Sequence, residues 1–157
     1  MSFTLHGIGV SGGIAIGRVH LVSHAQLEVP HIEITADQVP AEQARLEAAL
    51  NKVRRELSDL ADHIPTNAPA EFEAFLNVHL MILGDETLAE APKQIIASQH
   101  CNADWALKQQ MEALLGQFDQ IDDLYLRERK TDVVQVVERV LRALIVDAGA
   151  GAKTPPP

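Results

Sequence analysis

The sequence is poor in cysteine and in long apolar runs. Its one cysteine, Cys101, excludes an intramolecular disulfide and a cysteine-based zinc cluster. We interpret this thiol as a small buried apolar residue. No run reaches the roughly 18 apolar residues that a transmembrane helix needs, and the N-terminus lacks the regions of a secretory signal. We therefore expect a reduced, cytoplasmic protein without a membrane partner.

Aromatic and basic side chains are also scarce. There are four Phe, one Tyr and one Trp in 157 residues, so the core must consist mainly of Leu, Ile, Val and Ala, which favours helices. Acidic residues outnumber basic ones by 22 to 13, which gives a formal charge of −9. This balance argues against nucleic acid as a partner, because Lys and Arg bind phosphates. It favours a basic partner or simple solubility.

The hydropathy pattern divides the chain into three parts. Residues 1–35 are glycine-rich and β-branched, and 14–22 predict a strand. Residues 36–147 are typical of helices almost throughout. Residues 148–157, rich in Gly, Ala and Pro, indicate a linker. We expect a mainly α fold: an antiparallel four-helix bundle with one helix broken near Gly84, plus a short N-terminal β segment.

Turn residues divide the helical part. The first helix is expected from Ala36 or Pro40 to His63, with one apolar stripe of regular spacing. The stripe consists of Leu46, Leu50, Val53, Leu57 and Leu60. The second helix is expected over 68–83, capped by Asn67 and ended by Gly84.

Three further segments follow Gly84. Asp85 caps a helix that reaches about Ser98, and Pro92 predicts a kink or a break within it. Asn102 caps the next helix. The last begins near Asp122, and its apolar residues include Leu126, Val133, Val137, Val140 and Leu144.

Residues 67–92 stand out by charge. They contain five acidic residues and no Lys or Arg, so they carry −5 of the total −9. The window is also apolar around more of its helix than one core stripe needs. Either it is an acid-edged apolar surface for a basic partner, or its helix is buried on several sides. His79 lies within it, where a core position and a binding role are equally compatible with the pattern.

The start of the last helix is dense in charge. Arg129 and Asp132 are three residues apart, so they can pair along the helix. Two interpretations stay open. The charges form a local ion-pair network, or Arg129 is placed beside the acidic window to hold a partner.

Three segments resemble, in order and spacing, the N-terminal region of Enzyme I of the bacterial sugar phosphotransferase system (phosphoenolpyruvate-protein phosphotransferase). They are residues 7–17, 74–86 and 122–133, and the similarity covers about 6–147. The resemblance implies phosphoryl transfer from phosphoenolpyruvate to an enzyme histidine and then to a histidine of HPr, a small phosphocarrier. It implies that the helical part docks HPr and that the β segment belongs to an α/β subdomain absent from this sequence.

The resemblance also implies site residues, by matched position. Nine residues are expected to face HPr or to support that surface: Glu71, His79, Met81, Ile82, Asp85, Glu86, Leu88, Leu126 and Arg129. Asn77 and Thr87 stand where relatives often have Glu. The family's Gly-Gly-x-Thr-Ser-His loop, which carries its phosphorylated histidine, does not occur in this sequence. No catalytic residue is therefore assigned, and this part alone is expected to be inactive.

Other implied features concern the full-length enzyme. It is expected to need Mg2+ and to form a homodimer through its C-terminal domain, whereas no cofactor is expected in this part. Two alternatives stay open. The chain is the N-terminal part of another phosphoenolpyruvate-utilising enzyme of dikinase type, or it is a stand-alone regulatory helical bundle.

Overall fold

The described residues form one short 3-10 helix and five α-helices. The computed structural model describes residues 4, 6–9, 12–14, 16–18, 27–120 and 122–151, without the side chains of 124–128 and 147–151. The elements are η1 (Ala36–Gln38), α1 (Val39–Asp62), α2 (Ala70–Leu83), α3 (Glu86–Gln99), α4 (Ala103–Asp119) and α5 (Leu124–Gly151). The predicted mainly α fold is confirmed.

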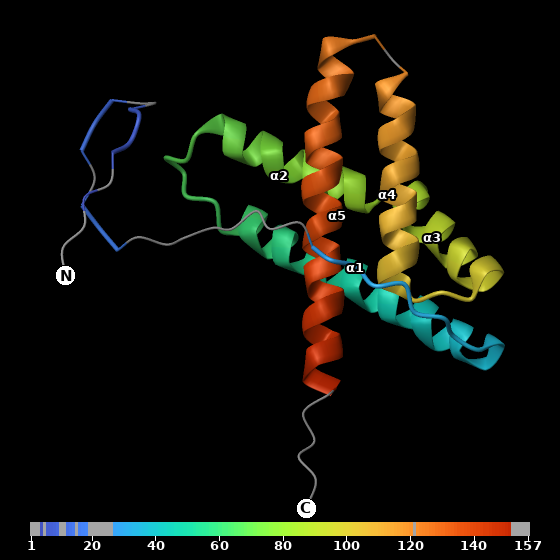
Figure 1. Cartoon of the computed structure of the whole chain (residues 1–157). Helices are drawn as coiled ribbons and strands as arrows, with labels where there is room; N and C mark the ends of the chain where they lie inside the picture. The colour runs from blue at the N-terminus through green and yellow to red at the C-terminus, as the bar shows by residue number, and fades with distance from the viewer. Residues whose placement is uncertain are drawn as a thin grey trace, which may run out of the picture.

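The helices are arranged as two crossed antiparallel groups (Figure 1). In one group α1 runs against α2 and α3, which follow each other in nearly one direction. In the other group α4 and α5 form a hairpin that lies steeply across the first. The four predicted helical units are therefore present, with α2 and α3 as the broken one.

The predicted apolar stripe of α1 forms much of the core. Leu46, Leu50, Val53 and Leu57 are almost completely buried, whereas Leu60 is 45% exposed. Leu60 differs because it lies in the last turns of α1, beside an open groove between α1 and α5. From α5, four predicted residues close the core: Val133, Val137, Val140 and Leu144.

The break between α2 and α3 follows Leu83, as expected. Gly84 nevertheless has ordinary backbone angles (φ −83°, ψ −8°), so the stop does not require a glycine in the left-handed region. Asp85 is extended, and its carboxylate accepts the N–H of Thr87 at 2.8 Å. Arg54 of α1 donates to the carbonyl oxygen of Leu83 at 2.8 Å. The break is therefore made by an N-cap and by a hydrogen bond from another helix.

The predicted cap of α2 was wrong, and of the kink or break predicted at Pro92 the break does not occur. Asn67 does not cap α2, whose N-cap residue is Pro69 with φ −59°, already set for helix entry. Pro92 does not break α3, which continues from residue 86 to residue 99. The ring of Pro92 is buried in the core, and Gln43 of α1 donates to the carbonyl of Lys93 at 3.0 Å. Packing of the ring offsets the hydrogen bond that proline removes.

The predicted N-terminal β segment is not found among the described residues. More than half of the expected strand 14–22 lies outside the description, and its described residues join no ladder. Ile8, Ile14 and Ile16 are more than nine-tenths exposed. A strand needs a neighbour for its backbone hydrogen bonds, and the described residues offer none there.

The C-terminal boundary also differs from the expectation. Residues 148–151, expected as part of a linker, continue α5 as helix. Residues 152–157 lie outside the description.

Residues 27–35 cross the bundle and are fastened to the start of α4. Asn102 accepts the N–H of Ile32 at 3.0 Å and donates to the carbonyl of Pro30 at 3.1 Å. Asn102 is the N-cap residue of α4, as predicted, but its side chain makes no capping hydrogen bond. Its amide instead holds the crossing segment.

The same segment is held by the end of α3. His100 adopts a left-handed conformation (φ 49°, ψ 53°) at the C-cap, and its carbonyl oxygen accepts the N–H of Ile34 at 2.9 Å. Glu33 and Cys101 form an antiparallel β-bridge there. The segment is thus paired by backbone as well as by side chain.

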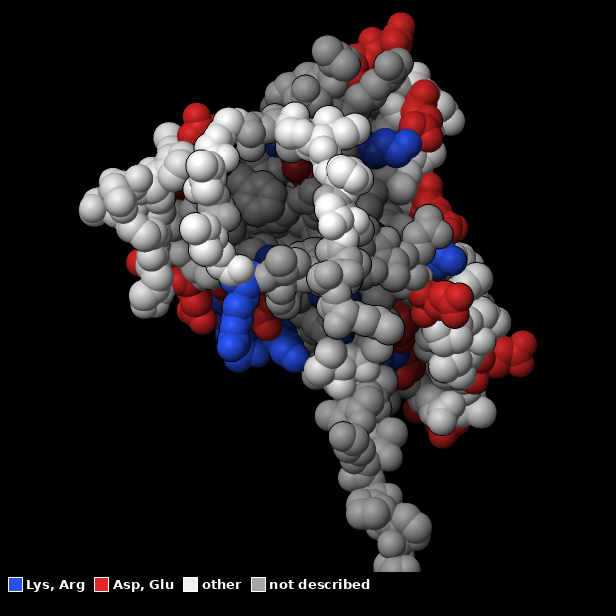
Figure 2. Space-filling view, turned by 60° about the vertical axis from the view of Figure 1, so that its left-hand side comes forward, with Lys and Arg blue, Asp and Glu red and all other residues white. Residues whose placement is uncertain are grey.

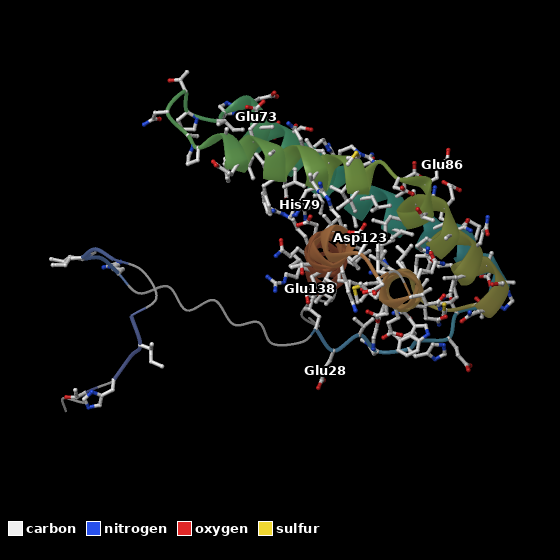
Figure 3. All side chains as sticks on the ribbon, turned by 90° about the horizontal axis from the view of Figure 1, so that it is seen from above. Glu28, Glu73, His79, Glu86, Asp123 and Glu138 are labelled. Carbon is white, nitrogen blue, oxygen red and sulfur yellow. The ribbon has the colours of Figure 1, made fainter. Side chains whose placement is uncertain are left out.

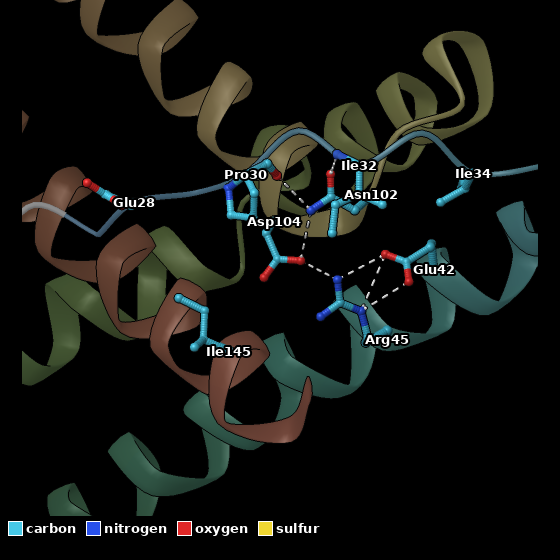
Figure 4. A pocket seen from close by; sticks show the side chains of 9 residues that line it. All are labelled: Glu28, Pro30, Ile32, Ile34, Glu42, Arg45, Asn102, Asp104 and Ile145. Carbon is cyan, nitrogen blue, oxygen red and sulfur yellow. Dashed lines mark hydrogen bonds and ion pairs between the residues drawn. The ribbon is translucent and has the colours of Figure 1, made fainter. Parts of the chain in front are cut away.

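An ion-pair cluster around Arg45 joins three helices (Figure 4). The guanidinium of Arg45 pairs with Glu42 at 3.0 Å, with Asp104 of α4, and with the carbonyl of Leu144 of α5 at 3.4 Å. Glu42 also accepts the N–H of Ala103 at 2.7 Å. A carboxylate of α1 therefore satisfies a free N–H at the start of α4.

Arg45→Met should lower the free energy of unfolding by about 2–3 kcal/mol, because it leaves two partly buried carboxylates without their cation. Arg55→Met, on the exposed side of α1, should change it by less than about 0.5 kcal/mol. Urea unfolding followed by circular dichroism measures both. Equal effects of the two substitutions would contradict a structural role for the cluster.

Candidate partner-docking surface

The nine sequence-predicted site residues do not form one surface. Four are exposed: Glu71, Met81, Asp85 and Glu86. Ile82 and Arg129 are half-buried, and His79 and Leu88 are each 3% exposed. The backbone of Leu126 is part of α5, but its side chain lies outside the description.

The four exposed residues lie on α2, at the break after it and at the start of α3; we call them the acidic edge. Figure 3 shows Glu73 and Glu86 on the side of α2 and α3 that faces away from α5, whereas His79 points from α2 toward α5. Met81 is 67% exposed and supplies an apolar side chain among the acids. Acidic side chains are not confined to this edge: in the space-filling view of Figure 2 they are spread over much of the visible face.

The acidic residues of this region differ in whether their carboxylates already have hydrogen-bond or ion-pair partners. The carboxylate of Asp85 accepts both the hydroxyl and the N–H of Thr87, and these hydrogen bonds lower the pKa of Asp85. Glu90 pairs with Lys93 at 3.1 Å. Glu71, Glu73 and Glu86 make no hydrogen bond or ion pair within the described part of the chain. A basic partner could pair with these three carboxylates.

His79 occupies a core position between α2 and α5. Its ring packs on Phe75 with the ring centroids 3.9 Å apart. Its Nε2 has no hydrogen-bond partner and lies 3.9 Å from Oδ1 of Asp132. Burial lowers the pKa of His79, and Asp132 opposes this only in part. Of the two interpretations of this histidine, the structure supports the buried one.

Arg129 and Asp132 form the predicted pair along α5, with Nη1 and Oδ2 3.5 Å apart. Asp132 therefore faces both Arg129 and His79. Neither Asp132 nor Phe75 is among the nine predicted site residues. Their spacing could have indicated them, because residues three or four apart on a helix lie side by side. Asp132 is three residues from Arg129, and Phe75 is four from His79.

The described part of the chain shows no accessible thiol and no group of metal ligands. Cys101 is fully buried, and burial raises the pKa of its thiol, so it is a poor nucleophile. Among the described residues, no three His, Cys, Asp or Glu side chains are grouped closely enough to hold a metal ion. Within the same part of the chain, no helix combines the length and apolar character needed to cross a bilayer.

Comparison with known proteins gives one consistent result. The sequence profile described as "PEP-utilising enzyme, N-terminal" matches residues 6–129. A phosphoenolpyruvate-protein phosphotransferase of Cupriavidus necator is 53% identical over 157 residues, which is 100% of this chain and 26% of that protein. The protein of the same name from Geobacillus stearothermophilus is 34% identical over 145 residues, covering 90% of this chain and 24% of its own length.

Two solved structures share the fold. A solution structure of Enzyme I (nEIt) superimposes with a TM-score of 0.70 at 23% identity, covering 77% of this chain and 49% of the other. The N-terminal domain of Enzyme 1 - Nitrogen gives a TM-score of 0.68 at 23% identity, covering 82% and 51%. The chain spans about a quarter of the length of the curated relatives named above.

Two neighbouring alanine substitutions test what makes the break between α2 and α3. Asp85→Ala should lower the free energy of unfolding by about 1 kcal/mol through loss of the N-cap. Gly84→Ala should be neutral or stabilising by up to about 1 kcal/mol, because its backbone angles suit alanine and an added Cβ would meet only ordinary contacts at 3.5 Å. Thermal and urea unfolding measure both. Strong destabilisation by Gly84→Ala would show that the glycine itself makes the break.

Proposed function

This chain belongs to the family of N-terminal regions of phosphoenolpyruvate-utilising enzymes, and on that premise we propose that its acidic edge docks HPr. HPr is the phosphocarrier that receives the phosphoryl group from Enzyme I. In this proposal the chain is the docking part of a phosphoenolpyruvate-protein phosphotransferase. The longer enzyme takes the phosphoryl group from phosphoenolpyruvate onto a histidine and passes it to a histidine of HPr.

One observation supports the docking role above others. Glu71 and Glu86 are exposed carboxylates without partners in the described part of the chain, and the exposed Met81 lies between them in sequence. A basic partner with an apolar centre complements such a surface in charge and in hydrophobicity. Unpaired rim charges of this kind mainly accelerate association and make it sensitive to salt.

The other predicted residues act from below this surface. Leu88 is buried under the start of α3, and Ile82 is half-buried on α2, so both support the helices that carry the acids. His79 of α2 approaches Asp132 of α5, and Asp132 also pairs with Arg129 on its own helix. The chain's own residues thus bind and orient HPr, and phosphoryl transfer is left to other parts of the enzyme.

The relatives' names favour this proposal over the dikinase alternative, since both curated proteins are phosphoenolpyruvate-protein phosphotransferases. The described residues do not fit a Mg2+ site, because they contain no suitable group of ligands. As the resemblance implies, we assign the Mg2+ requirement to the longer enzyme and its dimer contact to the C-terminal domain.

Titration of the 15N-labelled chain with unlabelled HPr tests the proposal directly. At low ionic strength, amide resonances of α2 and of the start of α3 should shift, and added salt should weaken the effect. The backbone at the C-terminal end of α1 serves as internal reference. Absence of any shift at low salt would rule out docking at this surface.

Glu86→Lys should weaken HPr binding roughly threefold to tenfold at low salt, because it reverses an unpaired charge at the acidic edge. Glu28→Lys provides the matched control: the same change of charge, on the opposite side of α5 from Glu86 (Figure 3). Isothermal titration calorimetry gives both affinities, and circular dichroism checks that each variant is folded. If the two variants bind equally well, Glu86 does not belong to the interface.

A further inference from the structure

His79 is the one buried side chain in the described residues with an unpaired polar atom. The residue is 3% exposed, its ring packs on Phe75, and its Nε2 lacks a hydrogen bond. Buried polar atoms almost always have a partner, so an exception calls for a physical reason. Figure 3 shows the ring directed from α2 toward α5, and the carboxylate of Asp132 on α5 lies 3.9 Å from its Nε2.

Charged side chains of α5 face this ring, and α1 contributes charges near them. On α5, Asp132 lies 3.9 Å from Nε2, and three further side chains line an open groove of about 600 Å3 together with His79: Glu138, Arg139 and Arg142. On α1, Glu56 approaches Arg139 at 3.9 Å, and Arg54 is held by the carbonyl of Leu83, one turn after His79. On α3, which follows α2, the nearest acid in sequence is the cap residue Asp85.

These surroundings decide the charge of the ring. Burial lowers the pKa of His79, Arg139 acts in the same direction, and Asp132 raises it again in part. The ring is therefore neutral at neutral pH. In that state Asp132 pairs with Arg129: Oδ2 of Asp132 is 3.5 Å from Nη1 of Arg129.

Protonation of the ring changes this arrangement. The protonated imidazole is a donor at both nitrogens, so Nε2 gains a proton to donate, and Asp132 is the acceptor within reach. Asp132 must then be shared between the imidazolium and Arg129. One positive charge is added between α2 and α5, on the inner side of the helix that carries Glu71 and Met81.

We propose that His79, Asp132 and Arg129 form a proton-dependent latch between α2 and α5 that regulates docking at the acidic edge. This proposal rests on the docking function above. With His79 neutral, the Asp132–Arg129 pair has no net charge, and the negative electrostatic potential at the acidic edge is not reduced. With His79 protonated, the added charge reduces that potential, and a basic partner binds less tightly. Docking should therefore weaken as the pH falls through the pKa of His79.

The latch can be tested first without a partner. Proton–carbon NMR of the histidine rings gives the pKa of His79 in the wild-type chain and in Asp132→Asn. The wild-type value should lie below the ordinary value of about 6.5. It should fall further in Asp132→Asn, because the carboxylate that favours the imidazolium is gone. An unchanged pKa of His79 in Asp132→Asn would overturn the latch.

Binding then tests the regulation. HPr affinity is measured from pH 8 to pH 5 for the wild type, for His79→Gln and for the surface control His63→Gln. HPr titrates as well, so the ratio of affinities at each pH is the readout. The ratio of the two affinities at pH 8, where His79 is neutral, is the reference. The wild type should lose about two- to fivefold more affinity at low pH, the range for one charge at a solvated surface. His63→Gln should follow the wild type.

The possible failures are distinguishable. If wild type and His79→Gln both bind with parallel pH profiles, the latch is wrong and the docking function stands. If the wild type binds HPr at no pH, the docking function fails and the regulation fails with it. If His79→Gln is unfolded by circular dichroism, Asp132→Asn replaces it. Its pH dependence should then be shifted to lower pH relative to the wild type, and an unshifted profile would overturn the proposal.

Discussion

The ion-pair cluster around Arg45 is the constraint on which the arrangement of the helices depends. A guanidinium has five donors in a fixed plane, so it can bind several acceptors from different directions at once. Arg45 uses this geometry to hold Glu42 on its own helix, Asp104 on α4 and the carbonyl of Leu144 on α5. The crossing of the two helical groups is thereby fixed at a polar point as well as by core packing.

The same helix, α1, also positions the docking surface. Arg54 holds the last carbonyl of α2, and Gln43 holds a carbonyl just after Pro92 of α3. These contacts set where α2 stops and how α3 continues. The acidic edge is therefore a consequence of polar side chains on α1, although α1 contributes none of its residues.

Local sequence patterns predicted the helices well, because both helix formation and the side of a helix that faces the core depend on neighbouring residues. The stripe from Leu46 to Leu57 is buried as its spacing requires. The same rules failed where a distant residue intervened. Pro92 is accommodated by core packing in an unbroken α3, and the amide of Asn102 is used for the crossing segment instead of a cap. None of these partners can be read from the neighbouring sequence.

The candidate site shows a similar division. Exposed carboxylates such as Glu71 and Glu86 were predictable, because charged side chains on a helix surface remain in solvent unless they are paired. His79 was not, since its burial depends on α5 crossing α2, more than forty residues later in the chain. The two open interpretations of residues 67–92 are each right for part of the window: Leu76 and Leu83 are buried, while Phe72 and Met81 are exposed.

His100 shows that an exposed residue can be under tight constraint. Its side chain is in solvent, but its backbone is left-handed and its carbonyl holds Ile34. A β-branched residue would resist that conformation, and the strain would be relieved most easily by releasing the crossing segment. Substitution at this surface position therefore affects how the crossing segment, residues 27–35, is held on the bundle. Solvent exposure is a poor guide to how freely this residue can vary.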